Sequence, residues 1–156
     1  MVYAVAMTTI QRFEDALGRT ALWAPRFVPG KDGTLHTQYV QRLRIYPHAL
    51  REANAYYSPA KNALLFGYFQ ANSQNAGDNL PGGLVFTCLS HDVVAHETTH
   101  ALMDGLHRYY QYQTNPDIAA FHEAFADIVA VFQHFSIPEA LRHTSTRRQE
   151  SPLEGR

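Results

Sequence analysis

The sequence has little of several features that would assign it to a common class of protein. Its 156 residues contain one cysteine, Cys88, which excludes an internal disulfide, and we expect this thiol to be a small buried apolar residue. The 13 Lys and Arg residues balance 14 Asp and Glu residues, so the net charge of -1 provides no basic field for nucleic acid or an anionic membrane. We therefore expect neither nucleic acid nor a membrane as a partner.

Long hydrophobic runs and a leader-like start are also missing. No apolar stretch approaches the roughly 18 residues that cross a bilayer. The opening MVYAVAMTTIQRF has no basic segment before its apolar part and no small-residue cleavage site. We therefore expect a soluble chain without a signal peptide. The compartment stays open, with the cytoplasm slightly favoured.

The spacing of apolar residues predicts helices on both sides of a strand-rich middle. Ile10, Phe13 and Leu17 lie three and four residues apart and Gly18 follows them, which predicts a helix that lines the core. A turn at Ser58-Pro59 divides two β-prone runs. The expected helices are residues 6–17, 92–108 and 116–135, and the expected strands are 35–40, 43–46 and two within 54–69.

This order of elements predicts an α+β fold in which a small N-terminal sheet packs against helices. The length fits one domain with one core, which we place at residues 1–135. Residues 136–156 are mostly polar, and we expect a short helix or a frayed tail there.

The stretch HDVVAHETTHALMDG, residues 91–105, contains the pattern His-Glu-x-x-His. On a helix, His96 and His100 lie about 40° apart and one turn along the axis, so both imidazoles can bind one ion. Glu97 points about 100° away from His96, where it can reach a water on the metal without being a ligand. The alternative is a helix with solvated polar side chains, but the neighbouring residues are mostly apolar, and buried imidazoles need partners there.

A catalytic zinc site needs a third protein ligand. The extended pattern His-Glu-x-x-His-x-x-Gly-x-x-His would place a histidine at position 106, which is Leu106 here. Glu123 is the better candidate, because it lies between Phe121 and Phe125 on the next helix, where a lone carboxylate would be costly. Asp127 follows one turn later and can accept a hydrogen bond from a metal-bound histidine. The alternative for both acids is a solvated stripe.

The run DVVAHETTHALMDG, followed after a connector by HEAFADI, resembles the active-site core of the thermolysin-like gluzincin zinc metallopeptidases. NAYY, residues 54–57, is similar to the substrate-lining edge strand of that family, usually Asn-Ala-Phe-Trp. The resemblance implies a zincin-like fold, one zinc ion and a peptide or protein substrate. It implies that the zinc ligands are His96, His100 and Glu123, that Glu97 is the general base, that Asp127 accepts a hydrogen bond from a zinc-bound histidine, and that the substrate-binding residues are Asn54, Ala55 and Tyr56.

The chain also departs from the pattern of this family. His122 stands where the family has Asn before the third ligand, and VAVFQHFSIPEALRH has no matches for the family's calcium-binding carboxylates. We therefore expect no structural calcium, and we expect Asp92, a calcium ligand in relatives, to be a helix N-cap. The family's C-terminal subdomain, with its catalytic His and Arg, has no counterpart here. We therefore expect this chain to form one wall of the cleft, and we expect such a subdomain as the partner that would form the other wall.

Three tyrosines follow the zinc-binding motif, where the family has an oxyanion-binding Tyr. The connector is three residues longer here, so the choice among Tyr109, Tyr110 and Tyr112 stays open, with Tyr110 and Tyr112 as candidate oxyanion donors. The sequence thus predicts peptide-bond hydrolysis by metal-bound water with Glu97 as base. The alternatives are a zinc-binding module that binds peptides without turnover, or an inactive fragment of a longer metallopeptidase.

Overall fold

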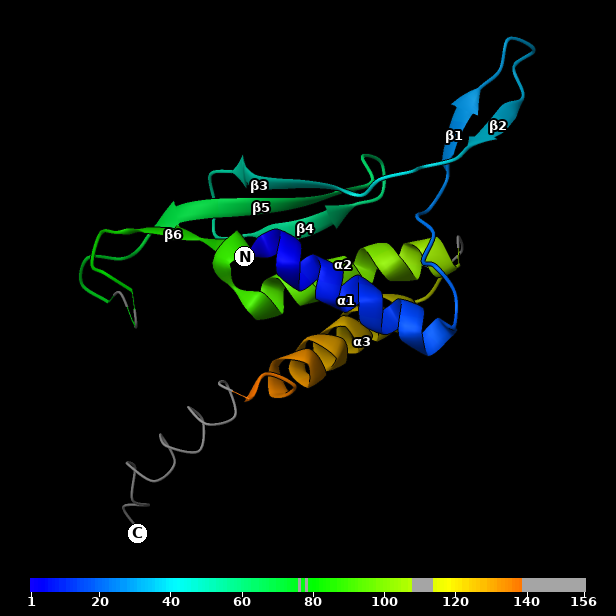
Figure 1. Ribbon diagram of the computed structural model, residues 1–156. Coiled ribbons are helices and arrows are strands. Elements are labelled where there is room, and N and C mark those ends of the chain that lie inside the picture. Colours follow the sequence, from blue (N-terminus) through cyan, green and yellow to red (C-terminus); the bar gives the residue numbers. More distant parts are fainter. Residues whose placement is uncertain (76, 78, 108–113, 139–156) are drawn as a thin grey trace.

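The computed structural model has an α+β fold in which a small sheet lies along one side of three α-helices (Figure 1). This confirms the expected α+β class. The structure describes residues 1–75, 77, 79–107 and 114–138. The described elements are α1 (Val2–Leu17), β1 (Arg26–Pro29), β2 (Leu35–Gln38), β3 (Arg44–Leu50), β4 (Ala55–Ser58), β5 (Ala63–Gln70), β6 (Leu84–Phe86), the 3-10 turn η1 (Thr87–Leu89), α2 (His91–Leu106) and α3 (Pro116–Phe135).

Strand β5 is the centre of the main sheet. It pairs in parallel with β3, antiparallel with β4, and at its far end with β6. Its first half, ALLF, is buried throughout, which is typical of a strand covered on both faces. A Cβ at Gly67 would overlap the carbonyl oxygens of Glu52 and Asn54, so glycine is required there. Because the order is β3-β5-β4, no other strand among the described residues pairs with the outer edge of β4.

Strands β1 and β2 form a separate antiparallel hairpin that projects from the body of the molecule (Figure 1). The strands expected at 35–40 and 43–46 correspond to β2 and β3, and the strand-turn-strand expected within 54–69 corresponds to β4 and β5.

Helix α2 is the central helix and contacts α1, α3 and the sheet. Its residues Val94, Ala95, Ala101 and Leu102 are buried in the core together with Phe66 of β5. Cys88, just before α2, is also buried, as expected. A helix that is covered on several sides holds its polar side chains in fixed directions, which matters for the site described below.

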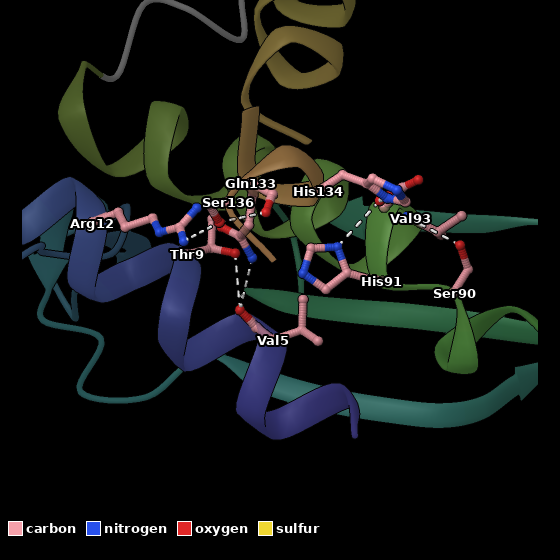
Figure 2. Close-up of polar contacts among 10 residues, drawn as sticks. Val5, Thr9, Arg12, Ser90, His91, Val93, Gln133, His134 and Ser136 are labelled. Atoms are coloured by element: carbon pink, nitrogen blue, oxygen red, sulfur yellow. Dashed lines mark hydrogen bonds and ion pairs between the residues drawn. The ribbon is translucent and has the colours of Figure 1, made fainter. Parts of the chain in front are cut away.

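Helices α1 and α3 are tied to each other directly (Figure 2). Buried Gln133 donates from Nε2 to the carbonyl oxygen of Val5 at 3.5 Å, and Arg12 of α1 donates to Ser136 Oγ just after α3. The ring of Phe125 packs edge-on against Phe13. These contacts fix where α3 lies relative to the other two helices.

Two details of the expected helices are corrected. Helix α1 begins at Val2, and its buried face is Val5, Ala6 and Thr9, whereas Leu17 is exposed. The spacing of the apolar residues predicted a buried face too near the C-terminal end of the helix. In the structure α1 is buried mainly along its first half. Gly18 ends the helix in the left-handed conformation (φ 65°), as expected from its lack of a side chain.

The prediction that Asp92 is the N-cap of α2 is wrong. Ser90 is the N-cap: its backbone is extended (φ -82°, ψ 118°) and its side chain accepts a hydrogen bond from the N–H of Val93. Asp92 lies inside the first turn, where its negative charge interacts favourably with the positive end of the helix dipole. Its carboxylate contacts His91 and His134.

None of the helices in the described ranges combines the length and the apolarity that crossing a membrane requires. Of the expected tail 136–156, only residues up to 138 belong to the described part of the chain.

Candidate metal centre

Helix α2 presents two imidazoles toward α3. His96 and His100 lie one turn apart, as the motif predicts, and their Nε2 atoms are 3.0 Å from each other. Their rings are nearly perpendicular, with centroids 4.7 Å apart. Two ring nitrogens that face one point at this distance are arranged to share one cation.

Glu123 of α3 completes a group of three ligand atoms with these histidines. Its carboxylate oxygens lie 3.3 Å from His96 Nε2 and 3.6 Å from His100 Nε2. Zinc bonds of about 2.0–2.2 Å at tetrahedral angles place neighbouring ligand atoms roughly 3.3 Å apart. The three distances, 3.0, 3.3 and 3.6 Å, bracket this value, so the residues present fit a zinc ion.

The surroundings of Glu123 differ from the expected ones. We expected an apolar environment that would make a lone carboxylate costly, but the side chain of Glu123 is 66% exposed and its neighbour Phe121 is exposed as well. The burial argument is therefore wrong, although the residue lies beside the two histidines. Glu123 reaches the histidines because α3 packs along α2, and an open carboxylate remains accessible to water there.

Asp127 lies one turn beyond Glu123 and contacts the other side of the His96 ring. Nδ1–H of His96 donates to Asp127 Oδ1 at 2.9 Å. This bond leaves the lone pair on Nε2 directed toward His100 and Glu123, as a metal ligand requires. Asp127 is 72% exposed, so water competes for its second oxygen.

His100 is neutral at physiological pH. Burial and, to a smaller extent, the nearby His96 together lower its pKa to about 4, against the opposing charge of Glu123. A neutral imidazole keeps a lone pair for a metal, so binding at this ligand displaces no proton near pH 7.

Glu97 is buried beside the two histidines but is not grouped with them as a ligand. Its Oε2 accepts a hydrogen bond from the backbone N–H of Tyr57 at 2.9 Å, which ties α2 to the free edge of β4. Burial raises the pKa of Glu97 to about 7, against the opposing effects of His96 and the Tyr57 N–H. A carboxyl group with this pKa can both take up and release a proton near neutral pH.

A second buried contact between β4 and α2 was not predicted from the sequence. Tyr57 O–H donates to Asp104 Oδ2 at 2.7 Å, and burial raises the pKa of Asp104 as well as that of Tyr57. The signal was available, because Asp104 is a carboxylate in an apolar helix, as Glu97 is. The ring of His122 is buried and stacks on His100 with centroids 5.9 Å apart.

Two adjoining cavities of about 300 and 500 Å³ flank the cluster, and Ala55, His96 and Glu97 line both. Asn54 lines the larger cavity and Tyr56 the smaller one. The structure therefore brings the predicted ligands, base and edge-strand residues together along one groove. Tyr109, Tyr110 and Tyr112, the oxyanion candidates, lie outside the described residues.

Comparison of the chain with protein-family models, with curated proteins and with solved structures finds no match. Function is therefore argued from the residues and geometry of this groove.

Proposed function

We propose that the chain is a zinc-dependent peptidase core with a zincin-like fold, similar to the thermolysin-like gluzincins, which hydrolyses peptide bonds. The observation that carries this proposal is the convergence of His96 Nε2, His100 Nε2 and the Glu123 carboxylate within 3.6 Å of one another, with a buried carboxylate, Glu97, beside them. His96, His100 and Glu123 would hold the ion. When bound, zinc supplies Lewis-acid polarisation of a carbonyl and lowers the pKa of water.

The ligand set, together with the buried carboxylate of Glu97 beside it, favours a catalytic over a purely structural ion. Structural zinc sites are usually closed by four Cys or His side chains, whereas three His and carboxylate ligands leave a position open to substrate. Glu97 is the described carboxylate beside these ligands that is held in place by a backbone N–H, that of Tyr57. It takes a proton from the attacking water and delivers it to the leaving amine, two steps that a pKa near neutrality allows.

Strand β4 supports a peptide as the substrate. Its free edge faces the groove, and Ala55 and Tyr56 line the cavities on the two sides of the zinc ligands. An extended peptide can add to such an edge through main-chain hydrogen bonds. The groove continues on both sides of Glu97, so the peptide extends past the cleaved bond in both directions, which suits an endopeptidase.

A second candidate is a zinc-binding module that binds peptides without turnover. The exposure of Glu123 and Asp127 favours it, because the groove is open to water on the α3 side within the described residues. Peptidases gain much of their rate from donors preorganised around the oxyanion in a site that excludes water, and losing one such donor costs about 100- to 1,000-fold. The open side would be closed by a further subdomain or partner.

The two candidates are separated by measuring binding and cleavage of one extended peptide side by side on the zinc-loaded chain. We expect binding together with slow cleavage, and both should weaken in a His96→Ala, Glu123→Ala double variant that loses about one zinc equivalent. His36→Ala, an exposed histidine of the β1-β2 hairpin, is the matched control. Peptide binding without any cleavage would favour the binding module, and a double variant with unchanged zinc content would overturn both.

A further inference from the structure

A second group of metal-ligating side chains lies at the other end of the contact between α2 and α3. His91 and Asp92 are in the first turn of α2, and His134 is in the last turn of α3. Figure 2 labels the two histidines. Asp92 Oδ1 lies 3.1 Å from His91 Nδ1 and 2.9 Å from His134 Nδ1. The three residues come from two helices that are far apart in the sequence.

We propose that His91, Asp92 and His134 form a second metal site, which binds a zinc-like transition-metal ion. The distances from Asp92 Oδ1 to His91 Nδ1 and His134 Nδ1 are close to the roughly 3.3 Å expected for neighbouring ligands of a tetrahedral zinc. All three ligand atoms lie within 4.8 Å of one another, and the two rings are nearly perpendicular, at 82°.

The donor set selects the kind of ion. Two imidazole nitrogens and one carboxylate suit zinc, cobalt, nickel or copper. Calcium takes six to eight oxygen ligands and magnesium needs oxygen ligands in octahedral geometry, so neither suits a site that offers one carboxylate. The site therefore discriminates against the abundant alkaline-earth cations.

The simpler reading is that Asp92 only accepts hydrogen bonds from two histidines. In that reading Oδ1 is shared by two N–H donors, and both imidazoles must adopt the Nδ1–H form. In the metal reading, the same nitrogens present lone pairs to one cation beside the carboxylate. The two readings differ in a measurable quantity, which is the number of metal ions bound by the chain.

The position of the site gives it a structural role. His134 lies 11 residues after Glu123 on α3, which is roughly 16 Å along the helix axis. An ion at each group would link α3 to α2 near the middle of α3 and at its C-terminal end. Because Asp127 and Val131 of α3 line the larger of the two cavities and lie between the two metal sites, the second ion would hold this wall of the groove in place.

The second site is expected to bind more weakly than the first. In the first site, Asp127 orients the ring of His96 through its far nitrogen, and such support typically strengthens metal binding by about 10- to 100-fold. His91 and His134 each contact Asp92 through Nδ1, and Asp92 is itself a member of the proposed ligand set.

The test is a titration of the metal-free 156-residue chain with Co²⁺, followed by visible absorbance and by elemental analysis after gel filtration. We expect about two equivalents with two affinities in the wild-type chain. About one equivalent should remain in His91→Ala, in His134→Ala and in the His96→Ala, Glu123→Ala variant, each checked for folding by circular dichroism. His36→Ala should keep both, and a large excess of Ca²⁺ should displace neither.

The variants separate this proposal from the peptidase proposal. One equivalent in the wild-type chain that disappears with His96 and Glu123 would overturn the second site and leave the first intact. Two equivalents that persist in folded His91→Ala and His134→Ala chains would also overturn it. One equivalent in the His96→Ala, Glu123→Ala chain that is lost on further His134→Ala substitution would establish it even if the chain cleaves no peptide.

Discussion

The two histidine and carboxylate groups on α2 and α3 differ in what surrounds them more than in their ligands. Each has two imidazoles and one carboxylate. The group at His96, His100 and Glu123 lies beside the free edge of β4, has Asp127 behind one ring and has buried Glu97 next to it. The group at His91, Asp92 and His134 has no such base among the described contacts. Under the two proposals, the ligands alone would give metal binding, and the neighbouring strand and carboxylates would give the first group its capacity for chemistry.

The largest expected effect concerns Glu97. Glu97→Gln keeps the size of the side chain but removes the group that accepts a proton, so cleavage should fall by about 100- to 10,000-fold while zinc content stays unchanged. The measurement is turnover of a fluorogenic peptide together with elemental analysis. Glu14→Gln is the control, because its amide oxygen can still accept the bond from the N–H of Ala21. Equal turnover in the Glu97→Gln chain would show that another group is the base.

The second largest effect is expected from metal removal, which should lower the free energy of unfolding. An ion that binds only the folded chain contributes about 2.7–4.1 kcal/mol when its free concentration is 100 to 1,000 times the Kd. We expect a chelator to lower the melting temperature of the wild-type chain. The shift should be smaller in the His96→Ala, Glu123→Ala variant and unchanged in His36→Ala. A melting temperature that chelation does not move would count against both metal sites.

Asp127→Ala tests whether the carboxylate behind His96 distinguishes the two groups. Zinc affinity at the first site should fall by about 10- to 100-fold, because the Nδ1–H of His96 loses its partner. Competition with a chromogenic chelator measures this change. Asp117→Asn, at the exposed start of α3, is the control. An unchanged affinity would mean that Asp127 is a solvated helix charge.

Tyr57→Phe tests the contact that holds β4 against α2. The substitution leaves the buried carboxylate of Asp104 without its O–H donor and should cost about 1–3 kcal/mol of unfolding free energy, measured by urea denaturation. Tyr56→Phe, on the more exposed neighbouring residue, should cost much less.

The pH dependence of this loss has a definite sign. Burial already raises the pKa of Asp104 above its ordinary value, and removal of the hydrogen bond from Tyr57 raises it further, because that bond favours the charged form. The folded variant then binds its proton more tightly than the unfolded chain, so its stability deficit grows as pH rises through the raised pKa. A deficit that is equal at pH 4 and pH 8 would contradict this account.

Much of the fold was predictable where the signal is local. Gly18 ends α1, Ser58 and Pro59 lie between β4 and β5, and the His-Glu-x-x-His spacing places His96, Glu97 and His100 on one helix. The N-cap of α2 was predicted wrongly because Ser90 and Asp92 are both good caps by residue type. The choice depends on which backbone is extended, and in the structure it is that of Ser90.

Contacts between elements were less predictable. The choice of Glu123 placed that residue correctly beside the histidines, but for a reason that the structure contradicts, since its side chain is exposed. The bond from Tyr57 to Asp104 and the meeting of His91 with His134 were missed, because sequence periodicity gives the face of a helix but not the neighbour that it meets.

The sequence by itself determined the α+β order of elements and the two imidazoles with an adjacent carboxylate on α2, because these depend on residue spacing within one helix or strand. Only the tertiary structure decided that the carboxylate of Glu123 lies beside the two imidazoles, that the backbone N–H of Tyr57 holds Glu97, and that a second group of potential ligands forms at His91, Asp92 and His134. The physical reason is that the position of α3 is set by packing against α1 and α2, through residues such as Gln133 and Phe125 that carry none of this chemistry.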